Sequence, residues 1–190
     1  MATSKVEIAN GALQRLGARR IESLTQDSPN ARSMNAAFDR VVRSEIRRYG
    51  WNFAIKRASV AADGTDETIL TEYNRYSLPN DFIRLLRDDE SGIAVDWKVE
   101  GVYILSTTAS PLEFRYLAHI TDPNYYDSLF IEAVECKLAM VCCKEITGSH
   151  SNAAGIKIDY EDAIAEARRA NALEKEAQEF PEDSWLAARR

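Results

Sequence analysis

The sequence has few of the residues that build metal centres or disulfide frameworks. It contains 3 cysteines and 2 histidines in 190 residues, and neither type recurs at the spacing of a zinc site. Cys142 and Cys143 are adjacent, point in different directions on a helix and would make a poor disulfide. We therefore expect Cys136, Cys142 and Cys143 to be buried thiols in a protein made in a reducing cytoplasm, with no metal bound.

Long hydrophobic runs are also missing. No stretch approaches the roughly 18 apolar residues that a membrane-spanning helix needs. Residues 1–10, "MATSKVEIAN", lack the apolar segment and the cleavage pattern of a signal peptide. The sequence therefore predicts a protein that is neither secreted nor bound to a membrane.

Motifs of common enzyme classes are absent. The chain has no glycine-rich phosphate loop, no G-x-S-x-G and no H-E-x-x-H. His119 and His150 stand alone, and the acidic run 88–90 precedes Ser-Gly, a pattern typical of a solvated turn. We expect no catalytic residues and no cofactor, so an enzyme is the class that the sequence favours least.

The charge of the chain is unevenly distributed. The net charge is −6, but residues 1–57 hold 11 Lys and Arg against 5 Asp and Glu, whereas residues 58–190 hold 13 against 25. One end is therefore positive by 6 charges and the remainder negative by 12. Such a split favours contacts between unlike surfaces of neighbouring molecules.

Capping signals predict about four helices. Ser4 and Glu7 form a capping-box pair that begins the first helix, which Gly17 ends. Ser28-Pro29 begins a second helix that ends at Gly50. Asp122-Pro123 repeats the cap-and-proline pattern before a third helix, whose apolar residues cover two adjoining faces and place it in the middle of a bundle. A fourth helix is expected at 152–178.

Turn residues and short strand-like runs fill the middle of the chain. Runs such as "VYILS" and "LEFRYLA" are rich in β-branched and aromatic residues. The predicted fold class is α+β, with a mainly α-helical bundle core and a small inserted antiparallel β region. The predicted divisions are 1–57 with 121–178 for the helical core, 58–120 for the β region and 179–190 for a C-terminal tail.

The segment 39–57, "DRVVRSEIRRYGWNFAIKR", allows two interpretations. Its arginines and aromatic side chains would suit a clamp on nucleic acid. The acidic pI of about 5.1 argues against that. The alternative is that the arginines face solvent or another protein, as in a ring where unlike faces of successive subunits meet. Trp51 and Phe53 follow the helix end and are expected to anchor the chain structurally to the core.

The order of these segments resembles the tail tubular protein A family, the head-to-tail adaptors of short-tailed bacteriophages (podoviruses). The resemblance is carried by residues 9–60, where a helix ending in Leu-Gly, a loop with Ser-Leu and a long helix lead to Gly-Trp-Asn-Phe. Residues 73–86, "YNRYSLPNDFIRLL", resemble the Tyr-x-Leu-Pro-x-Asp-Phe segment of that family. With the helical pair after residue 122, the resemblance spans nearly the whole chain.

This resemblance implies a structural virion protein at the head–tail junction. It implies a ring of 12 subunits between the portal protein and the tail nozzle, with tail fibres as further partners. Double-stranded DNA would pass through the channel during genome retention and ejection, without sequence-specific binding. The implied subunit-interface residues are Arg40, Arg43, Arg47 and Arg48. The implied portal-docking residues are Phe180, Trp185, Leu186, Arg189 and Arg190. The alternative function is a DNA-binding accessory protein that uses the arginine-rich segment 39–57.

Overall fold

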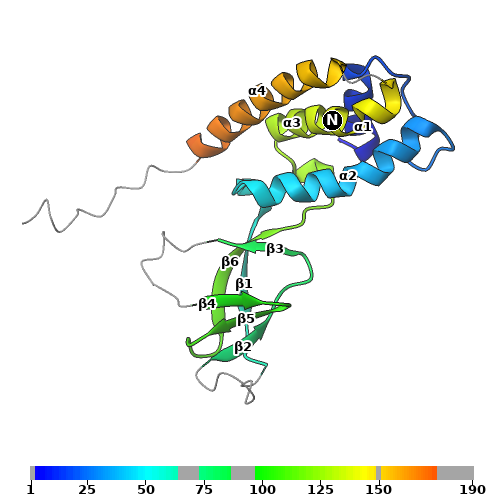
Figure 1. The fold of residues 1–190 in the computed structure, drawn as a ribbon. Helices are drawn as coiled ribbons and strands as arrows, with labels where there is room; N and C mark the ends of the chain where they lie inside the picture. Colours follow the sequence, from blue (N-terminus) through cyan, green and yellow to red (C-terminus); the bar gives the residue numbers. More distant parts are fainter. Residues whose placement is uncertain (1–2, 64–72, 87–96, 149–150, 175–190) are drawn as a thin grey trace, which may run out of the picture.

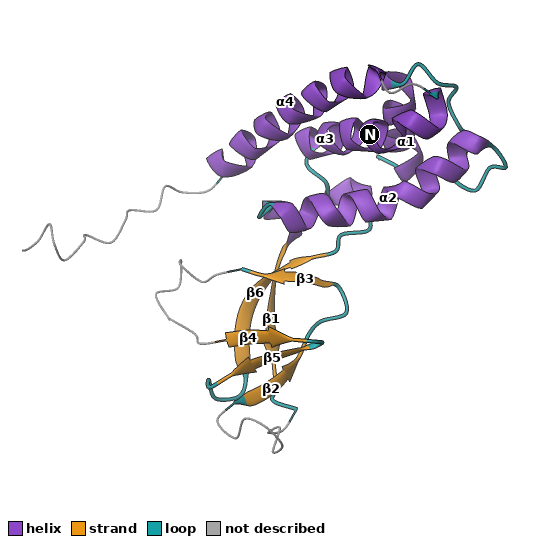
Figure 2. Cartoon of the chain, viewed as in Figure 1, coloured by secondary structure: helices purple, strands orange, loops and turns teal. Residues whose placement is uncertain are grey.

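The computed structural model of the chain describes residues 3–63, 73–86, 97–148 and 151–174. A body of four α-helices lies above a body of short β-strands (Figure 1). Figure 2 shows the same division by secondary structure. The fold is α+β, which confirms the predicted class.

The first two helices begin where the caps predict. In α1 (Lys5–Arg15), the Ser4 side chain accepts from the Glu7 backbone N–H and the Glu7 side chain accepts from the Ser4 N–H. Gly17, with φ of 65°, then turns the chain away from α1. Helix α2 (Pro29–Arg48) has Ser28 as its N-cap and Tyr49 as its C-cap. The apolar residues of this helix that recur at helical spacing are buried as far as Ile46.

The third helix begins later than predicted. Asp122-Pro123 starts a short 3₁₀ helix, η2 (Pro123–Tyr125), and Tyr126 then returns to an extended conformation. Helix α3 (Ser128–Thr147) begins after Asp127, whose carboxylate accepts from two backbone N–H groups of the first turn. A second N-cap residue five positions on thus takes over the role that the sequence assigned to Asp122.

Helix α3 occupies the centre of the helical body, as its two apolar faces predict. It packs against α1, α2 and α4 (Ser151–Leu173). Figure 1 shows α3 between α2 and α4, which therefore lie on different sides of it. Ion pairs join α1 to its neighbours, from Lys5 to Asp39 at 2.9 Å and from Arg15 to Glu132 at 3.0 Å.

The β body consists of two three-stranded antiparallel sheets. One sheet has the order β1-β6-β3 and the other β2-β5-β4. The strands are β1 (Ile55–Val60), β2 (Asn74–Ser77), β3 (Phe82–Leu85), β4 (Trp97–Glu100), β5 (Tyr103–Ser106) and β6 (Leu112–Ala118). Side chains from both sheets, including Tyr76, Ile104 and Phe114, share one small core.

Packing between the two bodies is continuous. Ile83 of β3 and Leu117 of β6 are buried in the helical core rather than in the β core. The Arg47 guanidinium at the end of α2 also donates to the Ile83 carbonyl oxygen at 2.5 Å.

The chain enters the β body through η1 (Asn52–Ala54), and β1 begins at Ile55, three residues before the predicted start at 58. Lys56 and Arg57 therefore belong to a strand, although the sequence placed them in the helical core.

Candidate subunit-interaction site

Two of the four predicted interface arginines project freely from α2. Arg40 and Arg43 are exposed. Neither makes a hydrogen bond or ion pair with another described residue. The exposed Arg32, about two and three turns before them, pairs with Asp27 at 2.5 Å. Arg40 and Arg43 are therefore the guanidinium groups of α2 that are available to an external partner.

The other two arginines have partners inside the chain. Arg47 reaches the Ile83 carbonyl, as described above, and so holds β3 against α2. Arg48 donates to the Tyr160 hydroxyl oxygen of α4 at 2.8 Å. These intrachain contacts were missed by sequence reasoning, because residues 36 and 112 positions apart cannot be paired from local patterns. Whether Arg47 and Arg48 also meet a neighbouring subunit stays a prediction.

A buried carboxylate lies beneath Arg48. Glu45 is 0% exposed, and its Oε2 accepts from the Tyr160 hydroxyl at 2.9 Å. Among the described residues its Oε1 has no hydrogen-bond partner, and the nearest cation, Arg48 Nη1, is 3.9 Å away. Burial, and then the neighbouring Glu45 carboxylate, raise the pKa of Tyr160. Burying a charged carboxylate is costly unless it is paired. The Glu45 side chain therefore joins α2 to α4 only while Tyr160 and Arg48 remain beside it.

Glu45 was also missed, although the sequence contains a signal for it. It lies three and four residues after Val42 and Val41, on the apolar stripe of α2. Residues at this spacing share one helix face, and the rest of that face is buried. A single acidic residue within an apolar stripe therefore indicates a buried carboxylate with a polar partner on another element.

Trp51 and Phe53, the predicted structural anchors, lie in an aromatic cluster at the junction of the two bodies. Trp51 is 1% exposed, and its indole N–H donates to the Glu45 carbonyl oxygen at 2.9 Å. The ring centroids of Trp51 and Phe53 each lie 4.9 Å from that of Phe130 in α3. Tyr126 completes the cluster, 5.4 Å from Phe130. The segment after α2 is thus fastened to the middle of the helical body.

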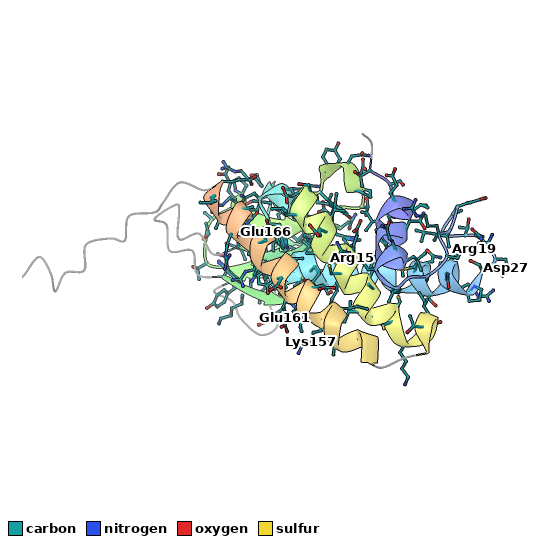
Figure 3. All side chains as sticks on the ribbon, turned by 90° about the horizontal axis from the view of Figure 1, so that it is seen from above. Arg15, Arg19, Asp27, Lys157, Glu161 and Glu166 are labelled. Atoms are coloured by element: carbon teal, nitrogen blue, oxygen red, sulfur yellow. The ribbon has the colours of Figure 1, made fainter. Side chains whose placement is uncertain are left out.

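Helix α4 presents an acidic outer face. Asp159, Glu161, Asp162 and Glu166 are all exposed, and Lys157 lies 3.5 Å from Glu161. The exposed Arg168 and Arg169 follow them toward the end of the helix. Figure 3 labels Glu161 and Glu166 on α4, and Arg19 at the far end of the helical body on the loop between α1 and α2. The helical body therefore carries acidic and basic surfaces on different elements.

An open groove lies where the two bodies meet. Its volume is about 480 Å³, and its lining includes Phe53, Ile55, His119, Ile120 and Tyr125. Tyr125 is 68% exposed. Burial lowers the pKa of His119, and the nearby Arg43 guanidinium lowers it further. The groove has the size of a ligand site, but its lining offers no nucleophile and base within hydrogen-bond reach of each other among the described residues.

The described residues contain no cluster of three or more histidine, cysteine, aspartate or glutamate side chains that would hold a metal ion. All three cysteines are buried, and burial raises the pKa of Cys142 to about 11, which disfavours the reactive thiolate. In the part of the chain that the structure covers, no helix is both long and apolar enough to cross a membrane.

The predicted portal-docking residues lie outside the described residues. These are Phe180, Trp185, Leu186, Arg189 and Arg190. The comparisons with known proteins leave the family open, since no protein-family model matches the chain and no curated protein matches its sequence.

Proposed function

We propose that this protein is the structural subunit of a ring-shaped head-to-tail adaptor, which joins a portal to a tail nozzle and extends the channel for DNA. The observation that carries the proposal is the separation of charge on the helical body. The free arginines Arg40 and Arg43 lie on α2, and the acidic face lies on α4, on another side of the central helix α3. Unlike faces that complement one another favour a head-to-tail contact, and such contacts form a ring when the rotation from one subunit to the next closes a circle.

The acidic balance of the chain also suits a channel protein. Tight binding of DNA depends on Lys and Arg side chains that neutralise phosphates. The net charge here is −6, and two of the four arginines of the predicted interface are already engaged within the chain. A channel lined by a protein with few free cations lets a DNA duplex slide past. A DNA-binding accessory protein, in contrast, would need a larger surface of unpaired Lys and Arg side chains.

Size-exclusion chromatography with light scattering tests this function on the chain alone and on the chain mixed with its portal. We expect a large ring in at least one of the two conditions. The double variant Arg40→Glu/Arg43→Glu should weaken assembly by about tenfold or more per reversed charge, because each reversal places like charges opposite one another. Arg57→Glu, an exposed arginine on β1, is the matched control and should assemble normally.

A monomer in both conditions would contradict the proposal. If that monomer bound short duplex DNA with a steep dependence on salt, the DNA-binding alternative would take its place. Normal ring assembly by Arg40→Glu/Arg43→Glu would keep the ring but remove these arginines from its interface.

Removal of residues 180–190 tests the proposed portal contact. We expect the truncated chain to keep the circular dichroism spectrum and melting temperature of the full chain, because the described helices, the last of which is Ser151–Leu173, do not include this segment. Association with the portal, measured by co-sedimentation, should fall by at least tenfold, since the three apolar anchors are lost with it. Equal association of the truncated and full chains would refute the docking role.

A further inference from the structure

Polar contacts, rather than apolar packing, hold the end of helix α4. The last buried residue of α4 is Ala167, and every described residue from Arg168 to Glu174 is exposed or half-buried. Leu173 is 86% exposed. The first part of α4 differs, because Ile156, Tyr160 and Ile164 are buried against the core. The two halves of α4 are therefore held by different forces.

The contacts of the final turns converge on residues 49–52. Asn171 donates from Nδ2 to the Gly50 carbonyl at 3.0 Å, and its Oδ1 accepts from the Asn52 backbone N–H at 2.8 Å. Asn52 in turn donates from Nδ2 to the Asn171 carbonyl at 2.9 Å and to the Glu174 carboxylate at 3.0 Å. The Arg168 guanidinium lies 4.4 Å from the centroid of the Tyr49 ring. Each of these groups can exchange its partner for water, so the net contribution of each contact is small.

We infer that residues 168–174 form a latch that opens and closes over residues 49–52 while the rest of the helical body stays folded. Segments held by few apolar contacts and by solvent-accessible hydrogen bonds open locally at low free-energy cost. Residues 49–52, which these contacts reach, are held in place by the buried aromatic cluster around Trp51 and do not open in the same way. The latch is thus the labile partner and the segment 49–52 the surface on which it closes.

The latch connects the end of α4, which continues into the last residues of the chain, with the segment that leads from α2 into the β body. Residue 174 continues directly into residues 175–190, and Asn52 begins η1, which leads into β1 at Ile55. Closing the latch restrains both the start of β1 and the point where the last segment of the chain begins. In the proposed ring, a partner that binds 175–190 would therefore act on the entrance to the β body, a step that rests on the proposed function.

Hydrogen exchange of the full chain, followed by mass spectrometry, tests the latch. We expect amides of 168–174 to exchange at least tenfold faster than those of 156–164. Asn171→Ala should speed the exchange of 49–55 by about tenfold, although the substitution is on α4. Asn52→Ala should speed the exchange of 168–174 in the same way. Because both substitutions break shared contacts, the double variant should add little to the larger single effect.

Asn35→Ala is the matched control, because Asn35 is exposed on α2, and it should leave both segments unchanged. Unchanged exchange at 49–55 in Asn171→Ala would overturn the inference. So would exchange of 168–174 at the rate of the buried half of α4. The experiment uses the free chain, so its failure leaves ring assembly untouched, and light scattering reports on the ring separately.

Discussion

Replacing Trp51 with alanine is expected to lower the free energy of unfolding by about 3–5 kcal/mol. Trp51 is among the largest fully buried side chains of the protein. Its ring packs edge-on against Phe130 at 4.9 Å between centroids and lies stacked with Phe53 at 6.2 Å. Truncation would remove these contacts and leave a cavity where the two bodies meet, and it would also leave the Glu45 carbonyl without its indole donor.

Chemical denaturation followed by far-ultraviolet circular dichroism measures this loss without relying on tryptophan fluorescence. For a chain of this size, 3–5 kcal/mol corresponds to a fall in melting temperature of roughly 6–20 °C. Trp51→Phe is the control, because it keeps an aromatic ring in the cluster and loses only the donor and part of the volume. A loss below about 1 kcal/mol for Trp51→Ala, the range of ordinary substitutions, would contradict the anchoring role of this residue.

Reversing the charge of Glu45 should be at least as damaging as losing Trp51. Glu45→Lys would place a buried ammonium group beside the Arg48 guanidinium, which now lies 3.9 Å from the carboxylate. Leaving a buried charge without an opposite partner costs about 3–5 kcal/mol. Whole domains are stable by only about 5–15 kcal/mol. We therefore expect Glu45→Lys to yield mainly unfolded or insoluble protein.

Glu45→Gln separates the effect of the charge from that of the shape. The amide oxygen of glutamine can still accept from the Tyr160 hydroxyl, and no charge then needs to be buried. We expect a change of at most about 1 kcal/mol in either direction, since Arg48 is 47% exposed and water can solvate it. Denaturation midpoints of the two variants measure the difference. A loss for Glu45→Gln as large as that for Glu45→Lys would show that the site needs the negative charge itself, and would contradict this expectation.

The starts of the first two helices could be predicted because the signals for them are local. The side chains of Ser4 and Ser28 each accept a backbone N–H three residues further on. All the atoms involved lie within one turn, so no distant residue changes the outcome. The same reasoning was wrong for Asp122, because two capping residues lie five positions apart and packing of Tyr126 and Phe130 into the aromatic cluster selects the second.

The burial pattern of the helices was likewise determined by the sequence. The spacing of Phe38, Val42 and Ile46 defines the buried face of α2, and apolar residues on two faces of α3 require neighbours on both. Helical periodicity alone establishes these faces, since the hydrophobic effect buries whichever stripe is apolar. The fold class followed from the same patterns.

Only the tertiary structure decided which partners the polar groups of α2 have. Arg47 meets a carbonyl 36 positions away, and Glu45 and Arg48 meet Tyr160 more than 110 positions away. The pairing of β1 with β6, and the contacts between Asn52 and Asn171, also join residues far apart in sequence. Such contacts depend on how the helices and sheets pack together, which local patterns in the sequence do not specify. The sequence thus determined the elements and their apolar faces, whereas the packing of those elements decided which charges are paired and which remain free for a partner.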